Sequence, residues 1–366
     1  MRSLVTGGAG FIGSHVVRAL LAAGDEVRVL HLPGEPLANL RGLEVERMAG
    51  DVTRPDECRV AVRGCERVFH LAAIYELWVP DAERMRAVNV DGTRNVLAAA
   101  AEAGVRKVVH TSSIAAFGGQ GQDGRATEAS AFRLEASGDP YVLTKREAHV
   151  LARAFASRGL DVTIVAPTAP IGPGDLRPTP TGRLLLAALR GPVALVPDVS
   201  ANLGDVRDIA RGHLLAAERG GRGESYLLGG DDVSMARLAR IALAVAGLRR
   251  PVGRVPDPLL RAAGAGLLWA SRRLTGRPPL LTPAAVATLR LGLRADCSRA
   301  FRELGLPRRP LEESVRDALR WFAEHGHIRS RRLRRALIGP SAAPGAAARS
   351  GASAASGRAS GGSLSA

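Results

Sequence analysis

The stretch Thr6-Gly7-Gly8-Ala9-Gly10-Phe11-Ile12-Gly13 decides how this chain of 366 residues folds. It follows a short apolar run that is typical of a strand, Leu4-Val5, and it opens a segment with helical periodicity, Phe11–Ala23. Glycines at this spacing permit a tight turn, and the helix N-terminus then offers unpaired N–H groups to a pyrophosphate. A chance turn in a glycine-rich protein is the alternative, and the strand–loop–helix context disfavours it. The loop therefore predicts a dinucleotide held at Gly7, Gly10, Phe11, Ile12 and Gly13.

The first half of the chain alternates short apolar runs with helix-length segments. Further buried strands are expected at Val27–Leu30, Val68–Leu71, Val108–His110 and Val162–Val165. Helices are expected between them, among others at Ala82–Ala103 and Val142–Ser157. This alternation predicts an α/β fold, a Rossmann-type doubly wound parallel sheet with helices on both faces. We place this dinucleotide-binding domain at residues 1–166, with segments near residues 205–220 returning to it.

The pattern changes after Pro167, because prolines crowd residues 167–180 and exclude a regular helix or a central strand there. Beyond them, helices are expected at residues 182–190, 209–219, 259–274 and 312–324, and Ser234 is placed to cap another. These segments predict a smaller, mostly helical substrate-binding domain at residues 167–326. Residues 327–366 are basic and rich in Ala, Ser and Gly, a composition that predicts a disordered tail.

The formal net charge of +16 raises the question of nucleic acid or an anionic membrane as a partner. Much of the excess lies beyond Glu324, where arginines occur without any acidic residue, so no specific nucleic-acid site is predicted. The sequence has no apolar run long enough for a spanning helix and no signal peptide, which favours the cytoplasm. Cys58, Cys65 and Cys297 show no metal-ligand or disulfide spacing, and no metal is expected.

The residues after the second and third strands bear on which dinucleotide is bound. An acidic residue after the second strand would pair with the ribose hydroxyls of NAD, but this chain has His31 there. The missing carboxylate gives a slight preference for NADP over NAD, with Arg41 as a partner for the extra phosphate. Asp51 ends the expected third strand, where it either reaches the adenine amino group or closes a turn.

Tyr141 and Lys145 form the predicted reactive pair. Asp139 can cap a helix and Pro140 suits its first position, so the tyrosine and the lysine share one helical face. A phenol with a pKa of ~10 is a poor base at neutral pH, but a neighbouring ammonium and an oxidised nicotinamide ring would both favour the phenolate. The tyrosine can then exchange a proton with a substrate oxygen while hydride moves at the adjacent carbon. Such a spacing occurs often by chance, yet the chain has only three tyrosines and, with Lys107, two lysines.

The expected fifth strand ends in Thr111-Ser112-Ser113. Ligands of open parallel sheets bind outside the carboxyl ends of the strands, so a hydroxyl here can orient a substrate carbonyl or alcohol. We expect Ser113 to be the catalytic hydroxyl and Thr111 to border the cofactor. The alternative for a hydroxyl at a strand end is to bond backbone groups only, and Ser112 is expected to have that role.

Together these residues resemble extended short-chain dehydrogenases/reductases, the group of nucleotide-sugar epimerases and dihydroflavonol reductases. The resemblance covers about residues 1–326. It is carried by the glycine loop, Gly50-Asp51-Val52, His70–Ala73, Asn89–Thr93, Thr111–Ser113, the tyrosine–lysine pair, Asp205–Asp208 and Asp296–Gly305.

The resemblance implies further binding residues. It implies that Asp51 and Val52 border the cofactor, that Leu71, Ala72 and Ala73 pack near its pyrophosphate and ribose, and that Asn89 fixes the central helix. It also implies that Pro167 and Thr168 border the nicotinamide amide. Within the family the chain looks most like hopanoid-associated sugar epimerases, through Ala72–Trp78, Pro167–Gly172 and Pro178–Arg183. That likeness places Tyr75, Ser113, Thr179 and Arg183 near the substrate.

Departures from the family narrow the chemistry. Sugar dehydratases of the family carry an Asp-Glu pair directly after the catalytic hydroxyl, where this chain has Ile114 and Ala115. Elimination of water is therefore not expected. Many nucleotide-sugar enzymes of the family carry Arg and Tyr where this chain has Ala166 and Ile171, which favours an apolar substrate.

The leading hypothesis is an NAD(P)-dependent epimerase or oxidoreductase that acts on a secondary alcohol or ketone, sugar-like or linked to a lipid or isoprenoid. A ketone reductase of the dihydroflavonol type, a hydroxysteroid-type dehydrogenase and a non-catalytic dinucleotide sensor are the alternatives. The partner is a small-molecule substrate, and a homodimer is left open. A membrane-facing helix at residues 259–274 is also left open beside its alternative, a helix that covers the active site.

Overall fold

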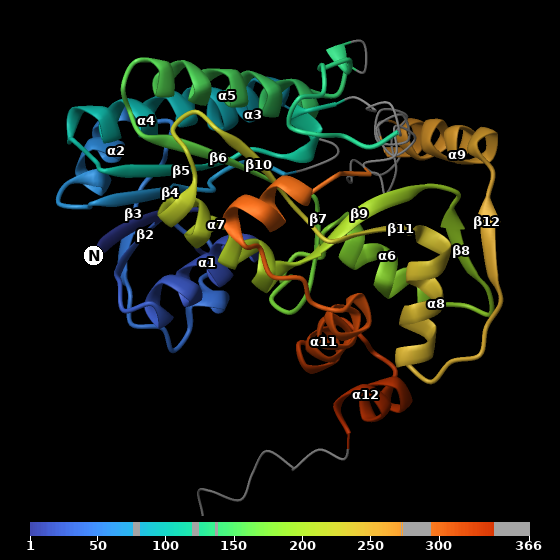
Figure 1. Cartoon of the computed structure of the whole chain (residues 1–366). Helices are drawn as coiled ribbons and strands as arrows, with labels where there is room; N and C mark the ends of the chain where they lie inside the picture. The colour runs from blue at the N-terminus through green and yellow to red at the C-terminus, as the bar shows by residue number, and fades with distance from the viewer. Residues whose placement is uncertain (76–80, 119–123, 136–137, 272, 274–293, 340–366) are drawn as a thin grey trace, which may run out of the picture.

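A seven-stranded sheet forms the centre of the dinucleotide-binding half in the computed structural model, which describes residues 1–75, 81–118, 124–135, 138–271, 273 and 294–339 (Figure 1). Its strand order is β10-β6-β5-β4-β1-β2-β3, and all neighbours are parallel. The strands are β1 (Arg2–Thr6), β2 (Glu26–His31), β3 (Glu46–Ala49), β4 (Arg67–His70), β5 (Lys107–Thr111), β6 (Val162–Pro167) and β10 (Ser225–Leu228).

Helices cover both faces of this sheet, as its strand composition requires. Every residue of β6 is buried, and a strand covered on both faces reads as a continuous apolar run. One face packs against α1 (Phe11–Ala22) and α7 (Val206–Arg219). The other packs against α2 (Pro55–Val62), α4 (Gly92–Glu102) and α5 (Pro140–Ser157), beside the short α3 (Ala82–Arg86). The predicted doubly wound sheet is confirmed.

The strand order reverses between β1 and β4, since the chain builds β2 and β3 on one side of β1 and then β4, β5 and β6 on the other. In a parallel sheet, loops diverge at such a point and leave a crevice at the carboxyl ends of the strands. The glycine loop, Leu71 and Ser113 follow three of these ends, after β1, β4 and β5. The topology therefore gathers them at one edge of the sheet.

The second unit contains two small sheets and several helices. A three-stranded sheet has the order β11-β9-β7, and β8 pairs with β12. Its strands are β7 (Ala169–Ile171), β8 (Ala194–Pro197), β9 (Ser200–Asp205), β11 (Asp231–Ser234) and β12 (Val252–Val255). Its helices are α6 (Pro180–Ala188), α8 (Met235–Val245), α9 (Asp257–Ala270), α11 (Leu311–Glu324) and α12 (Arg331–Ile338). As expected, the Ser234 side chain caps α8 by accepting from the Arg237 N–H.

Two expectations about the organisation of the chain need revision. The return to the large sheet extends beyond residues 205–220, because β10 forms its edge and residues 300–304 pack on α7. The tail predicted from residue 327 is also not disordered at its start. Residues 331–338 form α12, whose Leu333 and Leu337 are buried against the core that includes α11. Residues 340–366, the rest of that prediction, lie outside the described residues.

Within the described part of the chain, no helix is both long and apolar enough to cross a membrane.

Candidate active site

The glycine loop forms a closely packed cradle between β1 and α1. Gly7 has a φ of +70°, a conformation that glycine adopts without strain, and a Cβ there would stand 2.8 Å from the Ala72 backbone nitrogen. A Cβ on Gly13 would stand 2.1 Å from the Gly7 carbonyl oxygen, so the first turn of α1 can lie directly on the loop only without a side chain. No side chain caps α1 at Gly10. Its first N–H groups are therefore suited to a phosphate ligand.

Buried polar contacts hold the loop after β4 against this cradle. The Thr6 hydroxyl accepts from the Ala72 N–H at 3.2 Å and lies 2.8 Å from His70 Nδ1. Asn89 is buried in a π-helical turn, Ala87–Asp91, where its amide accepts from the Ile74 N–H and donates to the Ile74 carbonyl. The same amide donates to Thr144 of α5 at 3.2 Å. Asn89 thus fixes the central helix to the β4 loop, and π-helical turns are frequent at functional sites.

Tyr141 lies in the first turn of α5, where Asp139 caps the helix by accepting from the Tyr141 N–H at 2.9 Å. Ser113, which follows β5, lies close enough to the Tyr141 phenol to lower its pKa. Tyr75 contacts the Tyr141 ring edge-on with centroids 5.0 Å apart. Ser112 points elsewhere and is hydrogen-bonded to His149 at 3.1 Å. Of the two serines, only Ser113 therefore reaches the tyrosine.

Lys145 lies one turn beyond Tyr141 on the same face of α5. Its Nζ donates to the Thr111 carbonyl at 2.8 Å, and burial lowers the pKa of Lys145 to about 8. Burial also raises the pKa of Tyr141 above its ordinary value, although the hydrogen bond with Ser113 opposes this. In the structure, burial is the largest influence on the pKa of the phenol, and it opposes the phenolate that the ammonium and an oxidised nicotinamide ring were expected to favour.

A group of histidines lies beneath this pair. His70 and His110, on neighbouring strands, stack with centroids 5.5 Å apart, and both are buried as core residues. Burial lowers the pKa of His70 to about 3 and that of His149 to about 4, so both rings are neutral at pH 7. The charge of the Lys145 ammonium contributes to lowering the pKa of these histidines.

The ends of β2 and β3 present the residues expected to bind the adenosine half. His31 ends β2 half-buried, and Arg41 is an exposed residue after the short helix Ala38–Leu40. The Asp51 carboxylate accepts from the Thr53 N–H at 2.9 Å, which is the turn-closing role weighed for it. Val52 is buried, and its carbonyl accepts from the Asn95 amide.

The end of β6 offers a further sign that a ligand belongs here. Pro167 is the last residue of β6, and Thr168 follows with its N–H bonded to the Leu228 carbonyl. The Thr168 hydroxyl is buried and lacks a hydrogen-bond partner among the described residues. Buried hydroxyls are normally satisfied. The glycine cradle, the uncapped start of α1 and this hydroxyl together fit a dinucleotide.

Thr179 and Arg183, which were also expected near the substrate, differ in their contacts. Thr179 caps α6, and both its N–H and its hydroxyl donate to Asp175, so its polar groups are already engaged. Arg183 is exposed and donates to the Pro178 carbonyl. The charges of Arg183 and Asp175 both act on the Tyr75 phenol. Tyr75 and Arg183 therefore belong to one cluster beside Tyr141.

Sequence reasoning missed Asp175, which is buried and whose pKa burial raises to about 6. It also missed Asn39 and His15, which tie the loop at Pro173 and Gly174 to the dinucleotide-binding unit. Asn39 donates to the carbonyls of Ala9 and Gly174, and His15 bonds the Pro173 carbonyl at 2.8 Å. No motif marks these residues, and only their long-range contacts reveal them.

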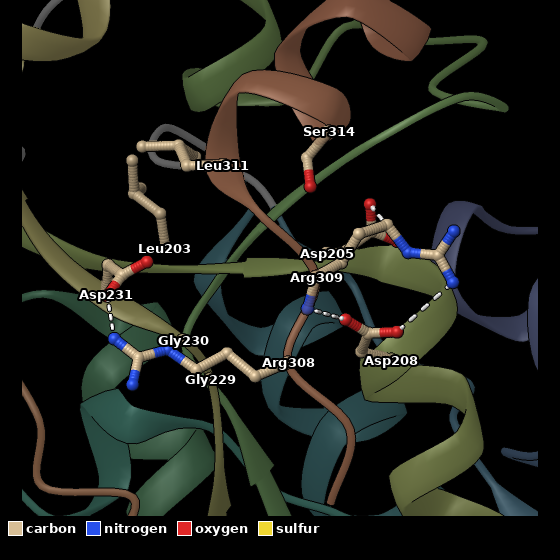
Figure 2. Close-up of a pocket in the computed structure, with 10 residues that line it drawn as sticks. All are labelled: Leu203, Asp205, Asp208, Gly229, Gly230, Asp231, Arg308, Arg309, Leu311 and Ser314. Carbon is tan, nitrogen blue, oxygen red and sulfur yellow. Dashed lines mark hydrogen bonds and ion pairs between the residues drawn. The ribbon is translucent and has the colours of Figure 1, made fainter.

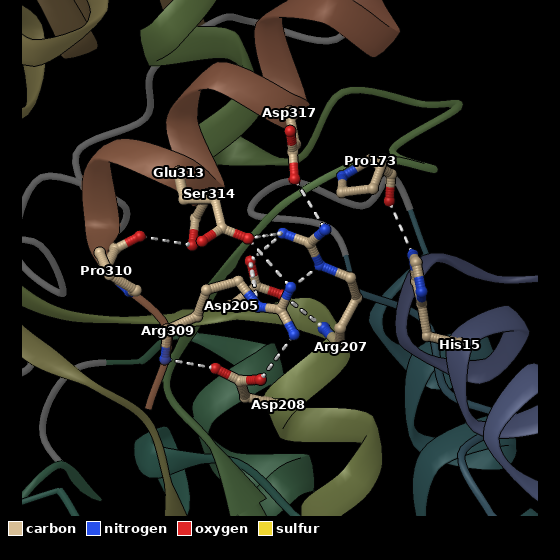
Figure 3. A network of polar contacts seen from close by, with 10 residues as sticks. All are labelled: His15, Pro173, Asp205, Arg207, Asp208, Arg309, Pro310, Glu313, Ser314 and Asp317. Atoms are coloured by element: carbon tan, nitrogen blue, oxygen red, sulfur yellow. Dashed lines mark hydrogen bonds and ion pairs between the residues drawn. The ribbon is translucent and has the colours of Figure 1, made fainter. Parts of the chain in front are cut away.

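A pocket and an ion-pair network at the junction of the two units lie apart from this chemistry. Figure 2 shows the pocket, whose lining includes Gly229 and Gly230 and neither Tyr141 nor Lys145. Arg308 and Arg309 line it but already pair with Asp231 and Asp208. The network of Figure 3 continues from this pocket along the start of α7 towards α11. We interpret the pocket as part of the junction that holds the units together.

Three comparisons with known proteins bear on this arrangement. The profile of the NAD dependent epimerase/dehydratase family matches residues 3–229. A putative dihydroflavonol 4-reductase of Synechocystis sp. is 37% identical over 335 residues, covering 89% of this chain and 96% of the relative. Sterol demethylase protein B of Methylococcus capsulatus is 37% identical over 333 residues, covering 90% of this chain and 100% of the relative.

Among solved structures, a nucleoside-diphosphate-sugar epimerase from Pseudomonas aeruginosa superposes with a TM-score of 0.73 at 27% identity. That match covers 90% of this chain and 99% of the epimerase. The glycine cradle, the strand-end residues and the helix with Tyr141 and Lys145 therefore occur on a fold shared with enzymes of known class. The chain is an enzyme of the extended short-chain dehydrogenase/reductase type and belongs to the NAD dependent epimerase/dehydratase family.

Proposed function

We propose that this enzyme moves a hydride between NAD(P) and the carbon of a secondary alcohol or ketone, while Tyr141 moves the proton of the substrate oxygen. The convergence of Ser113, which follows β5, with Tyr141 in the first turn of α5 at the carboxyl edge of the sheet carries this proposal. Two hydroxyls that converge there can hold one substrate oxygen, and one of them can exchange its proton. The cofactor, when bound, supplies or accepts the hydride.

The other site residues position this exchange. Lys145, held by the Thr111 carbonyl, places a charge within one helical turn of the phenol. Asn89 joins α5 to the β4 loop, which keeps Tyr141 in register with the glycine cradle. Burial raises the pKa of the Tyr141 phenol, and the charges of Lys145 and of the bound ligand together oppose this effect.

We propose an apolar substrate, either lipid- or isoprenoid-linked or steroid-like. Ala166 and Ile171 are both buried, so those positions present no Arg or Tyr to a nucleotide diphosphate. The name of the Methylococcus relative, a sterol demethylase protein, supports the same class. Elimination of water is not proposed, because Ile114 and Ala115 follow Ser113 where an acidic pair would be required.

Several finer expectations remain proposals. The lack of a carboxylate after β2, with His31 at its end and Arg41 exposed nearby in sequence, supports a slight preference for NADP. A homodimer, a cytoplasmic location and contact with a membrane surface complete the proposal.

A Tyr141→Phe variant tests the proton role. It should lose activity by roughly 10²–10⁴-fold, because it keeps the ring and loses only the exchangeable proton. Binding of NADPH, measured by fluorescence titration, should change little. Tyr226→Phe is the matched control, since its phenol lies on β10 and bonds the Gly221 N–H. Unchanged turnover in Tyr141→Phe would refute the role.

Net cofactor turnover separates the two forms of the reaction. A reductase consumes one NADPH or NADH for each ketone reduced. An epimerase returns the hydride to the other face of the same carbon, so the concentration of cofactor stays constant while product forms. Following absorbance of the reduced cofactor and substrate configuration in one reaction distinguishes them.

A further inference from the structure

Two side chains of the dinucleotide-binding unit hold consecutive carbonyls of the loop 173–175, which lies between β7 and α6. Burial lowers the pKa of His15 on α1, so its ring is neutral at pH 7. Its Nε2 lies 2.8 Å from the Pro173 carbonyl oxygen, which can only accept, so Nε2 carries the proton (Figure 3). Asn39, buried in the short helix Ala38–Leu40, donates to the Gly174 carbonyl at 3.0 Å. The loop is thus held from the other unit.

Asn39 also reaches the glycine cradle. An amide nitrogen has two protons to donate, and Asn39 Nδ2 gives the second to the Ala9 carbonyl at 3.3 Å. Ala9 precedes Gly10, the residue that caps α1 and lies next to the N–H groups suited to a phosphate. One side chain therefore bonds both the loop that receives the cofactor and the loop 173–175.

The loop 173–175 is packed closely against these two side chains. Gly174 has a φ of +95°, where a residue with a side chain is strained, and a Cβ on it would stand 3.2 Å from His15 Nε2. The Gly174 carbonyl also accepts from the Leu176 N–H at 2.9 Å. Because close packing leaves little slack, a displacement of His15 or Asn39 displaces the loop as well.

Asp175, the last residue of this loop, determines where α6 begins. Its buried carboxylate accepts from the N–H and the hydroxyl of Thr179, each at 2.9 Å, and Thr179 caps α6. A Cβ on Gly182 would stand 2.2 Å from Asp175 Oδ2, so the first turn of α6 lies directly on the carboxylate. The position of the loop therefore sets the position of α6.

α6 in turn lies beside the reactive tyrosine. The charges of Asp175 and of Arg183 on α6 both act on the Tyr75 phenol. The Tyr75 ring contacts the Tyr141 ring edge-on, with centroids 5.0 Å apart. A continuous series of contacts thus runs from the glycine cradle to the ring that lies next to Tyr141.

We propose that His15 and Asn39 are positioning residues that couple the two halves of the site, so that a cofactor bound in the glycine cradle holds Asp175 and α6 in place. The phosphates of the cofactor restrain Ala9 and the start of α1, and the two side chains extend that restraint to the loop 173–175. The coupling stands on these contacts and on dinucleotide binding by the family. That the restrained segment receives the substrate rests on the proposed function.

Amide hydrogen exchange of the full chain, with and without saturating NADPH and in the absence of substrate, tests the coupling. In the natural chain NADPH should slow exchange at least about fivefold in residues 173–186. His15→Leu and Asn39→Leu keep the bulk of the side chain and lose the donor. In each variant the slowing at residues 173–186 should fall to about twofold or less, whereas the slowing at residues 7–21 should persist because the cofactor still binds.

Two further variants separate positioning from a merely structural role. His15→Gln puts an amide nitrogen where Nε2 stands, so it can donate to the Pro173 carbonyl and should restore the slowing by NADPH. Asn95→Leu is the matched control for Asn39→Leu, because Asn95 donates to the Val52 carbonyl within the dinucleotide-binding unit. It should leave the slowing at residues 173–186 intact. A lower melting temperature in Asn39→Leu with an unchanged effect of NADPH would overturn the proposal.

Direct contact of the cofactor with the loop is the competing explanation. If NADPH slows exchange at residues 173–186 equally in the natural chain and in both Leu variants, His15 and Asn39 do not couple the two halves and the proposal fails. Tyr141→Phe removes the proton donor of the proposed reaction and should keep the full effect of NADPH at residues 173–186. The coupling and the proposed reaction can therefore fail independently.

Discussion

Lys145 is a residue of the candidate active site that lowers the stability of the folded protein. It is one of two lysines in the chain, it is buried, and its Nζ has the Thr111 carbonyl as a hydrogen-bond partner. The pKa of Lys145 falls from 10.5 to about 8 because burial disfavours the ammonium. Since the folded pKa is the lower one, the stability linked to this group is complete above about pH 10.5 and is lost as the pH falls through 8. At neutral pH the ammonium therefore costs stability.

Replacing this lysine should stabilise the protein while it abolishes turnover. Lys145→Met should raise the free energy of unfolding at pH 7 by roughly 1–3 kcal/mol, because no ammonium has to be buried. The gain should shrink towards pH 10, where the natural amine is largely neutral. Denaturant titration at both pH values measures this difference.

The other lysine provides the control for that experiment. Lys107 donates to the Asp161 carboxylate at 2.8 Å and to the Gly220 carbonyl at 2.7 Å. Lys107→Met should therefore lower stability at pH 7. A loss of stability in Lys145→Met as well would contradict the assigned cost of burying its ammonium.

At the scale of single residues, the sequence predicted the features that depend on local spacing along the chain. The helix start at Asp139 and Pro140 and the shared face of Tyr141 and Lys145 follow from local rules, and the structure has both. Asp175 could not be found in this way, because its importance comes from a fold that buries it beside Thr179. The direction of the Lys145 amine, towards a strand carbonyl, was also beyond local reasoning.

At the scale of the elements, the packing of α1 on the glycine loop depends on the absence of a Cβ atom at Gly13. A Cβ on Gly13 would overlap the Gly7 carbonyl, whereas a Cβ on Gly10 would stand 3.2 Å from the same oxygen. The two glycines thus differ in steric demand although both belong to one motif.

Alanine substitutions should separate them. Gly13→Ala should displace the first turn of α1 and weaken NAD(P)H binding at least about tenfold, with a loss of roughly 1–3 kcal/mol in stability. Gly10→Ala should bind within a few-fold of the natural chain, because a small shift relieves its contact. Fluorescence titration with NADPH and NADH measures both, and equal effects would contradict the packing described for the cradle.

Elements were predicted best where their periodicity was long. The six strands expected in the first half and α5 match the structure, since buried runs and helical spacing both repeat there. The strands β7, β8 and β9 went unpredicted, because β7 contains a proline and β8 and β9 are not the fully buried apolar runs that marked the central strands of the large sheet. α12 was missed because its arginines dominate the composition, although Leu333 and Leu337 lie one turn apart and pack inward.

For the molecule as a whole, a buried carboxylate joins the two units (Figure 3). Burial would raise the pKa of Asp205, but hydrogen bonds from Arg207 and Ser314 more than offset it, and the pKa lies below its usual value. Arg207 also pairs with Asp317 of α11 at 2.7 Å. Because the folded pKa is lowered, this contribution to stability is present above about pH 3.8 and is lost as the pH falls further.

Asp205→Asn should therefore destabilise the protein by about 3–5 kcal/mol at pH 7, because Arg207 loses its buried partner. Asp317→Asn is the matched control, since that carboxylate is partly exposed and should cost about 1 kcal/mol or less. Thermal unfolding at pH 7 and at acidic pH measures both. Equal costs for the two variants would show that the buried pair does not hold the junction.

The path of the chain between the units determines how the protein can be assembled during synthesis. The large sheet lacks its edge strand until β10 emerges from the ribosome, well after β7 and β9 of the other unit. Val109 and Val165 pack in a core that α7 completes, so an N-terminal fragment ending at residue 166 leaves them uncovered. Nascent chains that stop there expose an unpaired strand and apolar surface, which favours aggregation. The large sheet can therefore be completed only after β7, β8 and β9 of the second unit have been synthesised.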